Sequence, residues 1–154
     1  MNLSKNFSLK ELTASQVAVR NGLDNTPDQT VISNLQTLVE TILQPLRDHY
    51  GRSVRVSSGY RSPEVNSFVG GSKTSDHCKG QAADIEIDGV ANGDLAKYIA
   101  DNFKFTQVIL EFYTQGVPNS GWVHISYDAN NLKCETLTAT KINNKTVYLK
   151  GFAI

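Results

Sequence analysis

The chain has 154 residues, enough for one domain with its own core, and its 15 basic residues balance its 15 acidic ones. With no net charge to draw the protein to nucleic acid or to an anionic membrane surface, we expect neither as a partner. No run approaches the ~20 apolar residues of a membrane span, and the N-terminus lacks the apolar stretch of a signal peptide. We therefore expect a protein made in the cytoplasm, and its two cysteines are too few for a disulfide scaffold.

Two helices are predicted in the first part of the chain from their capping residues. A short one begins at Ser8, with Glu11 at the capping-box spacing. A longer one follows Thr26, which we predict as its cap, with Pro27 at the first helical position and Gln29 completing the box.

The longer helix carries apolar residues at helical spacing, which predicts one face packed in the core. Pro45 should bend it, because the ring removes a backbone donor and crowds the preceding turn, and Gly51 should end it. The apolar face consists of Val31, Ile32, Leu35, Leu38, Val39, Ile42, Leu43 and Leu46.

A half-buried strand is predicted around Val54 and Val56, followed by a short helix that opens at Ser62 and stops near Gly70. Residues 72 to 80 are then expected to form a loop.

A second strand follows the loop, because Ala83, Ile85 and Ile87 alternate with more polar neighbours, so that Asp84 faces away from the apolar side. Asn92 is predicted to cap the next helix.

The remainder of the chain is predicted to be mainly strands. Two are expected at 106 to 113 and 121 to 127, and the tail, 133 to 150, resembles a hairpin that turns near Asn143 and Asn144. Helices early and strands late predict an α+β fold, and with no repeat or linker we expect a single domain over residues 1–154.

Two of the three histidines lie in contexts that suit metal binding. His77 lies in the loop seven residues before Asp84, and His124 alternates with the apolar residues Val123 and Ile125, so it points away from the core. Two imidazoles and a carboxylate suit Zn²⁺ and leave a fourth position open for water, whose pKa falls to roughly 7 on the metal. By spacing alone, however, such residues are more often ordinary core or surface residues.

A motif adds to this reading. Ser75-x-His77-x-x-Gly80-x-Ala82-x-Asp84 resembles the signature of the M15 zinc peptidases, the D-alanyl-D-alanine carboxypeptidases and phage endolysins among them. Ser58-Gly59-Tyr60-Arg61-Ser62 and Trp122-Val123-His124-Ile125-Ser126 resemble the same family in the same order, and the resemblance covers about residues 6–128.

The resemblance implies a Hedgehog/DD-peptidase-like fold, a small antiparallel sheet flanked by helices, with zinc held by His77, Asp84 and His124. It also implies hydrolysis of amide bonds in peptidoglycan or its stem peptides. We expect a monomeric lysis endopeptidase of the phage type, which reaches the cell wall after phage-mediated permeabilisation of the membrane. A D,D-carboxypeptidase or dipeptidase that trims D-alanine is one alternative, and an inactive zinc-containing binding or structural module is another.

The family also implies a catalytic carboxylate, which many members carry three residues before the second zinc histidine. Here that position is Gly121. We predict Glu111 as the base instead, because the strands at 106 to 113 and 121 to 127 can form a hairpin that sets it beside His124. Arg61 resembles the arginine that stabilises the oxyanion or holds the substrate carboxylate.

Three further residues remain open between two interpretations. Trp122 lines a substrate groove or only packs beside the site. Ser75 and Asp76 orient the metal ligands by hydrogen bonds or only cap the loop.

Overall fold

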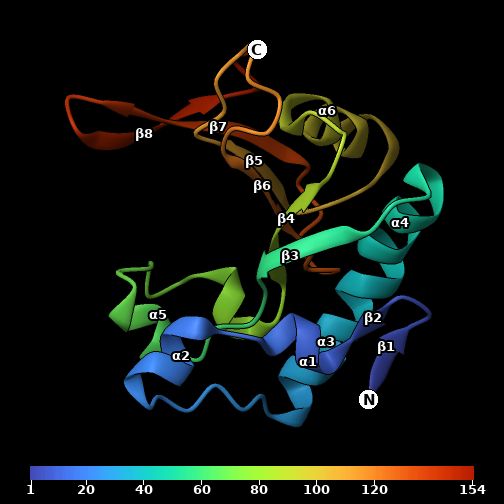
Figure 1. The fold of residues 1–154 in the computed structure, drawn as a ribbon, viewed down its shortest axis with the longest axis vertical. Coiled ribbons are helices and arrows are strands. Elements are labelled where there is room, and N and C mark those ends of the chain that lie inside the picture. The colour runs from blue at the N-terminus through green and yellow to red at the C-terminus, as the bar shows by residue number, and fades with distance from the viewer. The chain divides into compact units, whose positions relative to one another are not determined.

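The computed structural model describes residues 1–154 and divides into two compact units (Figure 1). One comprises Met1–Gly51 and Val56–Ala83, and the other comprises Arg52–Arg55 and Asp84–Ile154. The chain passes to the second unit after Gly51, returns to the first within strand β3 (Val54–Ser58) and passes to the second again within strand β4 (Ala82–Ile87). The fold is α+β, as expected. No helix is both long and apolar enough to cross a membrane.

Short elements open the first unit. The hydroxyl of Ser8 accepts a hydrogen bond from the backbone N–H of Glu11 at 3.1 Å, which confirms the predicted cap. The hydroxyl of Ser15 caps the next helix in the same way by accepting from Ala18 at 3.1 Å. These elements are β1 (Asn2–Ser4), β2 (Phe7–Ser8), α1 (Leu9–Thr13) and α2 (Gln16–Asn21).

The long helix begins two residues later than predicted. Helix α3 (Gln29–Leu38) is capped by Asp28, whose carboxylate accepts from the backbone N–H of Val31 at 2.9 Å. Thr26 instead belongs to the preceding turn, where its N–H donates to Asp24 Oδ1. An ionised acceptor at the positive end of a helix is at least as good a cap as a hydroxyl, so the nearer Asp28 takes the role.

Pro45 acts on the helix through a change of hydrogen-bond pattern. Helix α3 continues into a π-helical turn, η1 (Val39–Leu43), and then into α4 (Gln44–Tyr50). The N–H of Gln44 donates to the carbonyl of Val39, five residues back. The wider turn makes room for the proline ring, which would otherwise crowd the carbonyl four residues before it.

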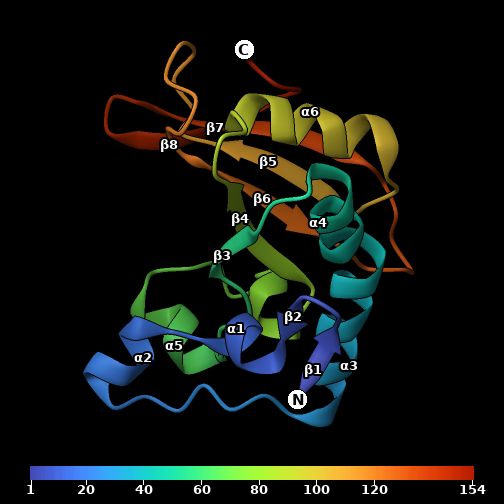
Figure 2. The ribbon, with the colours of Figure 1, turned by 45° about the vertical axis from the view of Figure 1, so that its right-hand side comes forward.

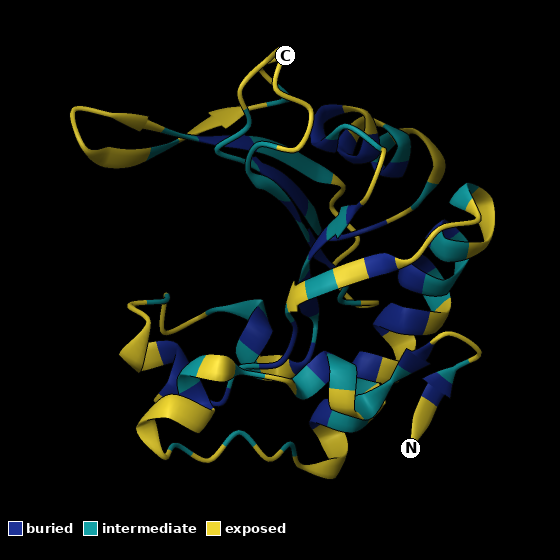
Figure 3. Ribbon diagram, in the orientation of Figure 1, coloured by how far each residue is buried: buried dark blue, intermediate teal, exposed yellow.

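The helix ends and packs largely as predicted. Gly51 takes the left-handed conformation, φ 63°, and ends α4 by donating its N–H to Arg47. The apolar face is buried except for Ile32, which is half-buried because it lies at the margin of the face. Figure 3 shows the burial along the ribbon. The buried residues are Val31, Leu35, Leu38, Val39, Ile42, Leu43 and Leu46.

The rest of the first unit leads to the predicted loop. Helix α5 (Pro63–Phe68) begins where the Ser62 hydroxyl accepts from the N–H of Val65 at 3.2 Å, as predicted. The segment from 72 to 80 is not wholly a loop, because it contains a 3-10 turn, η2 (Asp76–Lys79). One turn of helix is too short to leave a periodic pattern in the sequence.

The second unit contains most of a six-stranded sheet, with the strands in the order β3-β4-β6-β5-β7-β8. The sheet is mixed, so the expected small antiparallel sheet is wrong for these strands: β5 and β6 are antiparallel, whereas β5 and β7 are parallel. The reason is that the segment from 127 to 134 crosses the end of β5, since Ser126 and Glu135 both pair with Gln107. The remaining strands are β5 (Gln107–Glu111), β6 (Trp122–Ser126), β7 (Glu135–Ile142) and β8 (Lys145–Lys150).

Helix α6 (Asn92–Asn102) lies across one face of β5 and β6 (Figure 2). That face is fully buried, as the alternation of the strands requires. It consists of Val108, Leu110, Val123 and Ile125.

The predicted cap of α6 is wrong. Asn92 is the first residue of the helix and Ala91 precedes it, without a side-chain cap. The buried Asn92 amide instead donates to Glu86 Oε1 at 3.2 Å and to the carbonyls of Ser120 and Gly121 at 3.0 and 3.2 Å. It therefore ties the loop before β6 to β4, because a buried amide needs partners and these are within reach.

The tail forms the predicted hairpin. Strands β7 and β8 are antiparallel, and Asn143 and Asn144 both take positive φ, 52° and 63°, as a two-residue turn of this hand requires.

The cap of α3 can be tested by substitution. Asp28→Ala should lower the free energy of unfolding by about 1 kcal/mol, because the N–H of Val31 loses its acceptor. Urea unfolding measures the change, and Thr26→Ala serves as the control. An equal or larger loss from Thr26→Ala would contradict this assignment of the cap.

Candidate metal centre

His77 is held by the backbone of the first unit. It is 3% exposed, and the hydroxyl of Ser75 accepts a hydrogen bond from its backbone N–H at 3.2 Å. Its Nδ1 lies 2.7 Å from the carbonyl oxygen of Gly59. A carbonyl can only accept, so Nδ1 carries the proton and Nε2 keeps the lone pair, which is the tautomer of a metal-ligating histidine.

Two glycines allow this arrangement. A Cβ on Gly59 would collide with the carbonyl oxygen of Leu12. Gly80 ends the η2 turn at φ +73°, and a Cβ there would lie 2.7 Å from the carbonyl oxygen of Val31. The glycine three residues after His77 is therefore needed both for its backbone conformation and for its lack of a side chain. Gly59, whose carbonyl orients the imidazole, was not singled out from the sequence, although a glycine directly after a strand was a signal for close backbone approach.

Arg61 belongs to the same unit, and its backbone N–H donates to the carbonyl of His77 at 3.1 Å. The guanidinium Nε is buried and has no hydrogen-bond partner within the chain. A buried, unpaired cationic donor is costly, and a carboxylate is the group that satisfies it best. Arg61 lines a cavity of about 550 Å³, together with Ser15, Val17, Val56, Val65, Val69 and their neighbours.

Asp84 and His124 lie together in the second unit. Asp84 is in β4 and His124 in β6, and Asp84 Oδ1 lies 3.0 Å from His124 Nδ1. Their side chains are only 13% and 12% exposed. Metal–ligand bonds of 2.0–2.2 Å in tetrahedral geometry separate two ligand atoms by about 3.3 Å. The pair is thus spaced either for a hydrogen bond or for sharing one ion.

Glu111 lies on the same face of the sheet as His124. The predicted hairpin of β5 and β6 is present, and its register pairs Glu111 with Trp122 and Ile109 with His124. Glu111 is therefore the diagonal neighbour of His124, because it lies two residues beyond Ile109 on β5. The indole N–H of Trp122 donates to Glu111 Oε2 at 2.6 Å.

Trp122 packs beside the site and also holds Glu111, a contact that was not predicted. Its ring packs on Phe112 with centroids 5.5 Å apart, and its N–H holds the carboxylate of Glu111. Among the other two open residues, Ser75 caps η2, and the backbone carbonyl of Asp76 accepts from Gln81 at 3.0 Å. The capping interpretation therefore holds for Ser75, and through the N–H of His77 the cap also fixes the loop that carries the imidazole.

Position 121 has no room for a side chain. Gly121 has φ +63°, and a Cβ there would collide with the carbonyl oxygen of Glu111 and lie 2.7 Å from the carbonyl carbon of Phe112. This close approach is a property of the turn between β5 and β6. A carboxylate three residues before His124 is consequently excluded by the backbone.

The types of ligand fit a metal ion. Asp84 and His124 of the second unit and His77 of the first unit each offer one ligand atom. Two imidazole nitrogens and one carboxylate oxygen are a set that zinc accepts. The tautomer of His77 fits the same use, since it leaves Nε2 as the donor atom.

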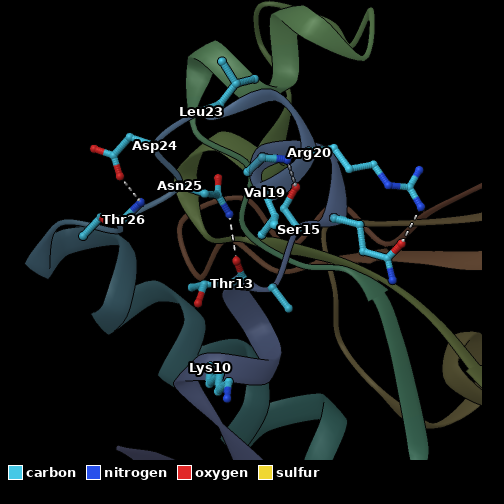
Figure 4. A pocket seen from close by; sticks show the side chains of 12 residues that line it. Lys10, Thr13, Ser15, Val19, Arg20, Leu23, Asp24, Asn25 and Thr26 are labelled. Atoms are coloured by element: carbon cyan, nitrogen blue, oxygen red, sulfur yellow. Dashed lines mark hydrogen bonds between the residues drawn. The ribbon is translucent and has the colours of Figure 1, made fainter.

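Another cavity of the first unit lies away from these residues. It measures about 790 Å³ and is formed by α1, α2 and the segment that follows α2 (Figure 4). Hydrogen bonds from Asn25 to the carbonyl of Thr13 and from Thr26 to Asp24 shape its wall. None of the predicted site residues lines it, so its size alone does not make it the site.

Cys78 follows a predicted ligand directly but differs from it in chemistry. Burial raises the pKa of its thiol, and the positive charges of Arg61 and Lys79 offset this only in part. The Cys78 thiol therefore stays protonated at neutral pH. The two cysteines also differ in exposure, because Cys78 is half-buried and Cys134 is exposed.

The two thiols should react at different rates. At pH 8 the disulfide reagent DTNB should label Cys134 first and Cys78 at least several-fold more slowly, because a partly buried thiol with a raised pKa offers little thiolate. The absorbance change measures both phases, and Cys134→Ser should remove the fast one. A fast phase that survives this substitution would overturn the assignment.

The constraint at Gly121 predicts a large loss of stability. Gly121→Ala should lower the free energy of unfolding by about 2 kcal/mol or more, because the methyl group meets backbone that cannot move aside. Gly116→Ala is the matched control, since Gly116 also has positive φ but has no atom within 4 Å of its Cβ position. Equal losses in the two variants would mean that conformation alone, and not the collision, decides the cost.

Comparison with known proteins adds one positive finding. The family model described as Peptidase M15 matches residues 5–126, and no curated protein matches the chain.

Proposed function

The chain belongs to the M15 peptidase family, a family of metallopeptidases, and we propose that it is a zinc-dependent enzyme that hydrolyses the stem peptides of bacterial peptidoglycan. The observation that carries this proposal is the pair of Asp84 and His124, 3.0 Å apart and largely covered. The tautomer of His77, the other histidine of the motif, supports it.

In this proposal His77, Asp84 and His124 hold the zinc ion. Bound there, zinc would supply a coordinated water with a pKa of roughly 7 and would polarise the substrate carbonyl. The carbonyl of Gly59 keeps His77 in its ligating orientation through Nδ1. Loss of such a hydrogen bond to a metal-ligating histidine commonly weakens metal binding or activity about 10- to 100-fold.

Glu111 acts as the general base. Its carboxylate takes the proton of the attacking water and then delivers it to the leaving amine, as a single acid–base residue can. The hydrogen bond from Trp122 to Oε2 holds the carboxylate in place for this proton transfer. The blocked position 121 supports this assignment, because the chain cannot carry the carboxylate where many family members have it.

Arg61 stabilises negative charge on the substrate. Its buried Nε without a partner suits a carboxylate of the peptide or the oxyanion that develops during attack. The apolar residues of its cavity, among them Val56, Val65 and Val69, suit small aliphatic side chains such as that of alanine.

We further propose that the protein works as a monomeric lysis endopeptidase on the cell wall. A D,D-carboxypeptidase would use the same residues on a substrate with a free carboxylate, and the bond that is cut separates the two. A binding or structural module that only holds zinc would have no use for a carboxylate oriented by an indole N–H, and the Glu111–Trp122 hydrogen bond favours the enzyme.

The experiment is hydrolysis of purified muropeptides by the zinc-loaded protein, with products identified by mass spectrometry. Chelation should abolish cleavage and added zinc should restore it. Glu111→Gln should lower kcat by about 10²- to 10⁴-fold with its zinc content unchanged, because the proton acceptor is lost while the metal ligands remain.

Two further variants serve as controls. His77→Ala should lose the zinc itself, measured by elemental analysis, and Glu40→Gln, an exposed carboxylate of the first unit, should change neither zinc content nor rate. Zinc binding without cleavage of any muropeptide would favour the module, and an undiminished rate in Glu111→Gln would remove Glu111 from the mechanism.

A further inference from the structure

The C-terminal hairpin of β7 and β8 lies beyond the residues that the family model matches, yet it is built onto the strand that carries Glu111. The register pairs Trp122 with Glu111, Glu111 with Ala139, and Ala139 with Tyr148. Directly paired residues point to the same face of a sheet. These four residues therefore form one row across β6, β5, β7 and β8, on the face opposite α6.

Tyr148 is the outermost member of this row. It is 54% exposed, while Ala139 between it and Glu111 has no exposed surface. The flanking side chains must therefore close over the small alanine. Burial, and next the charge of Glu111, raise the pKa of the Tyr148 hydroxyl.

An exposed tyrosine on the same face of the sheet as the proposed catalytic carboxylate has a chemical use. Its flat face packs on peptide planes and aliphatic groups, its hydroxyl forms hydrogen bonds, and its two side-chain torsions cost little entropy to fix. Both faces of β8 are largely exposed, so the packing of the sheet does not hold the Tyr148 ring against a neighbour.

We propose that Tyr148 is a specificity-determining residue that binds the distal part of an extended peptide substrate, so that the protein selects stem peptides of about four residues or more over dipeptides. Three interstrand steps of about 4.8 Å separate β6, which carries His124, from β8, or about 14 Å in all, and an extended peptide rises about 3.3 Å per residue. A bound dipeptide, about 7 Å long, is also shorter than the roughly 10 Å, or two interstrand steps, between β5, which carries Glu111, and β8. This inference rests on the proposed function and specifies its substrate class.

The test compares two substrates with the zinc-loaded protein: a stem pentapeptide and the dipeptide D-alanyl-D-alanine. Tyr148→Ala should raise KM for the pentapeptide about tenfold with little change in kcat, because the lost contact contributes to binding and not to the chemical step. Any hydrolysis of the dipeptide should proceed as in the wild type. Tyr148→Phe should keep most of the affinity, since the ring remains.

Leu149→Ala is the matched control, because Leu149 is adjacent, 41% exposed and on the other face of the strand. Equal effects of Tyr148→Ala on both substrates, or none on the pentapeptide, would overturn the inference while leaving the proposed function intact. If the wild type cleaves neither substrate, the proposed function fails. Calorimetric binding of the pentapeptide then decides the inference, with about tenfold weaker binding to Tyr148→Ala expected and equal binding refuting it.

Discussion

The antiparallel pairing of β5 with β6 is the constraint on which the second unit depends. It turns His124 to the face opposite α6 and aligns Glu111 with Trp122, whose indole N–H then reaches the carboxylate at 2.6 Å. It also leaves the other edge of β5 available, and β7 joins there in parallel because the segment from 127 to 134 crosses the end of β5. The row of residues on the face opposite α6 follows from this register together with those of β5 with β7 and of β7 with β8.

The same pairing explains why the chain has no carboxylate at position 121, three residues before His124. The turn that leads into β6 brings the backbone of Glu111 and Phe112 against Gly121 so closely that no side chain fits. From the sequence, position 121 is only a glycine at the place where the family resemblance implies an acidic residue. The structure instead gives the glycine a steric reason and puts a carboxylate on the neighbouring strand, held by a hydrogen bond. The absence of an acid at position 121 is therefore weak evidence for lost activity.

Local signals predicted the parts of the fold that depend on a few adjacent residues. Ser8 and Ser62 cap their helices, Gly51 ends α4, and the tail turns at Asn143. The predictions failed where several polar residues competed or where a distant partner intervened. Asp28 displaced Thr26 as a cap because both can accept from a helix N-terminus. The amide of Asn92 was drawn into the loop before β6 by carbonyls that lie 28 and 29 residues away in the chain.

By itself, the sequence determined the family signature that names the candidate ligands, the α+β class and the hairpin that joins β5 and β6, because each of these rests on motifs or patterns of neighbouring residues. Only the tertiary structure decided that Glu111 lies across from Trp122 and diagonal to His124, that the sheet is mixed, and that Tyr148 lies on the same face. The physical reason is that register between strands is set by the packing of segments far apart in the chain, and a shift of one residue would turn every side chain to the other face.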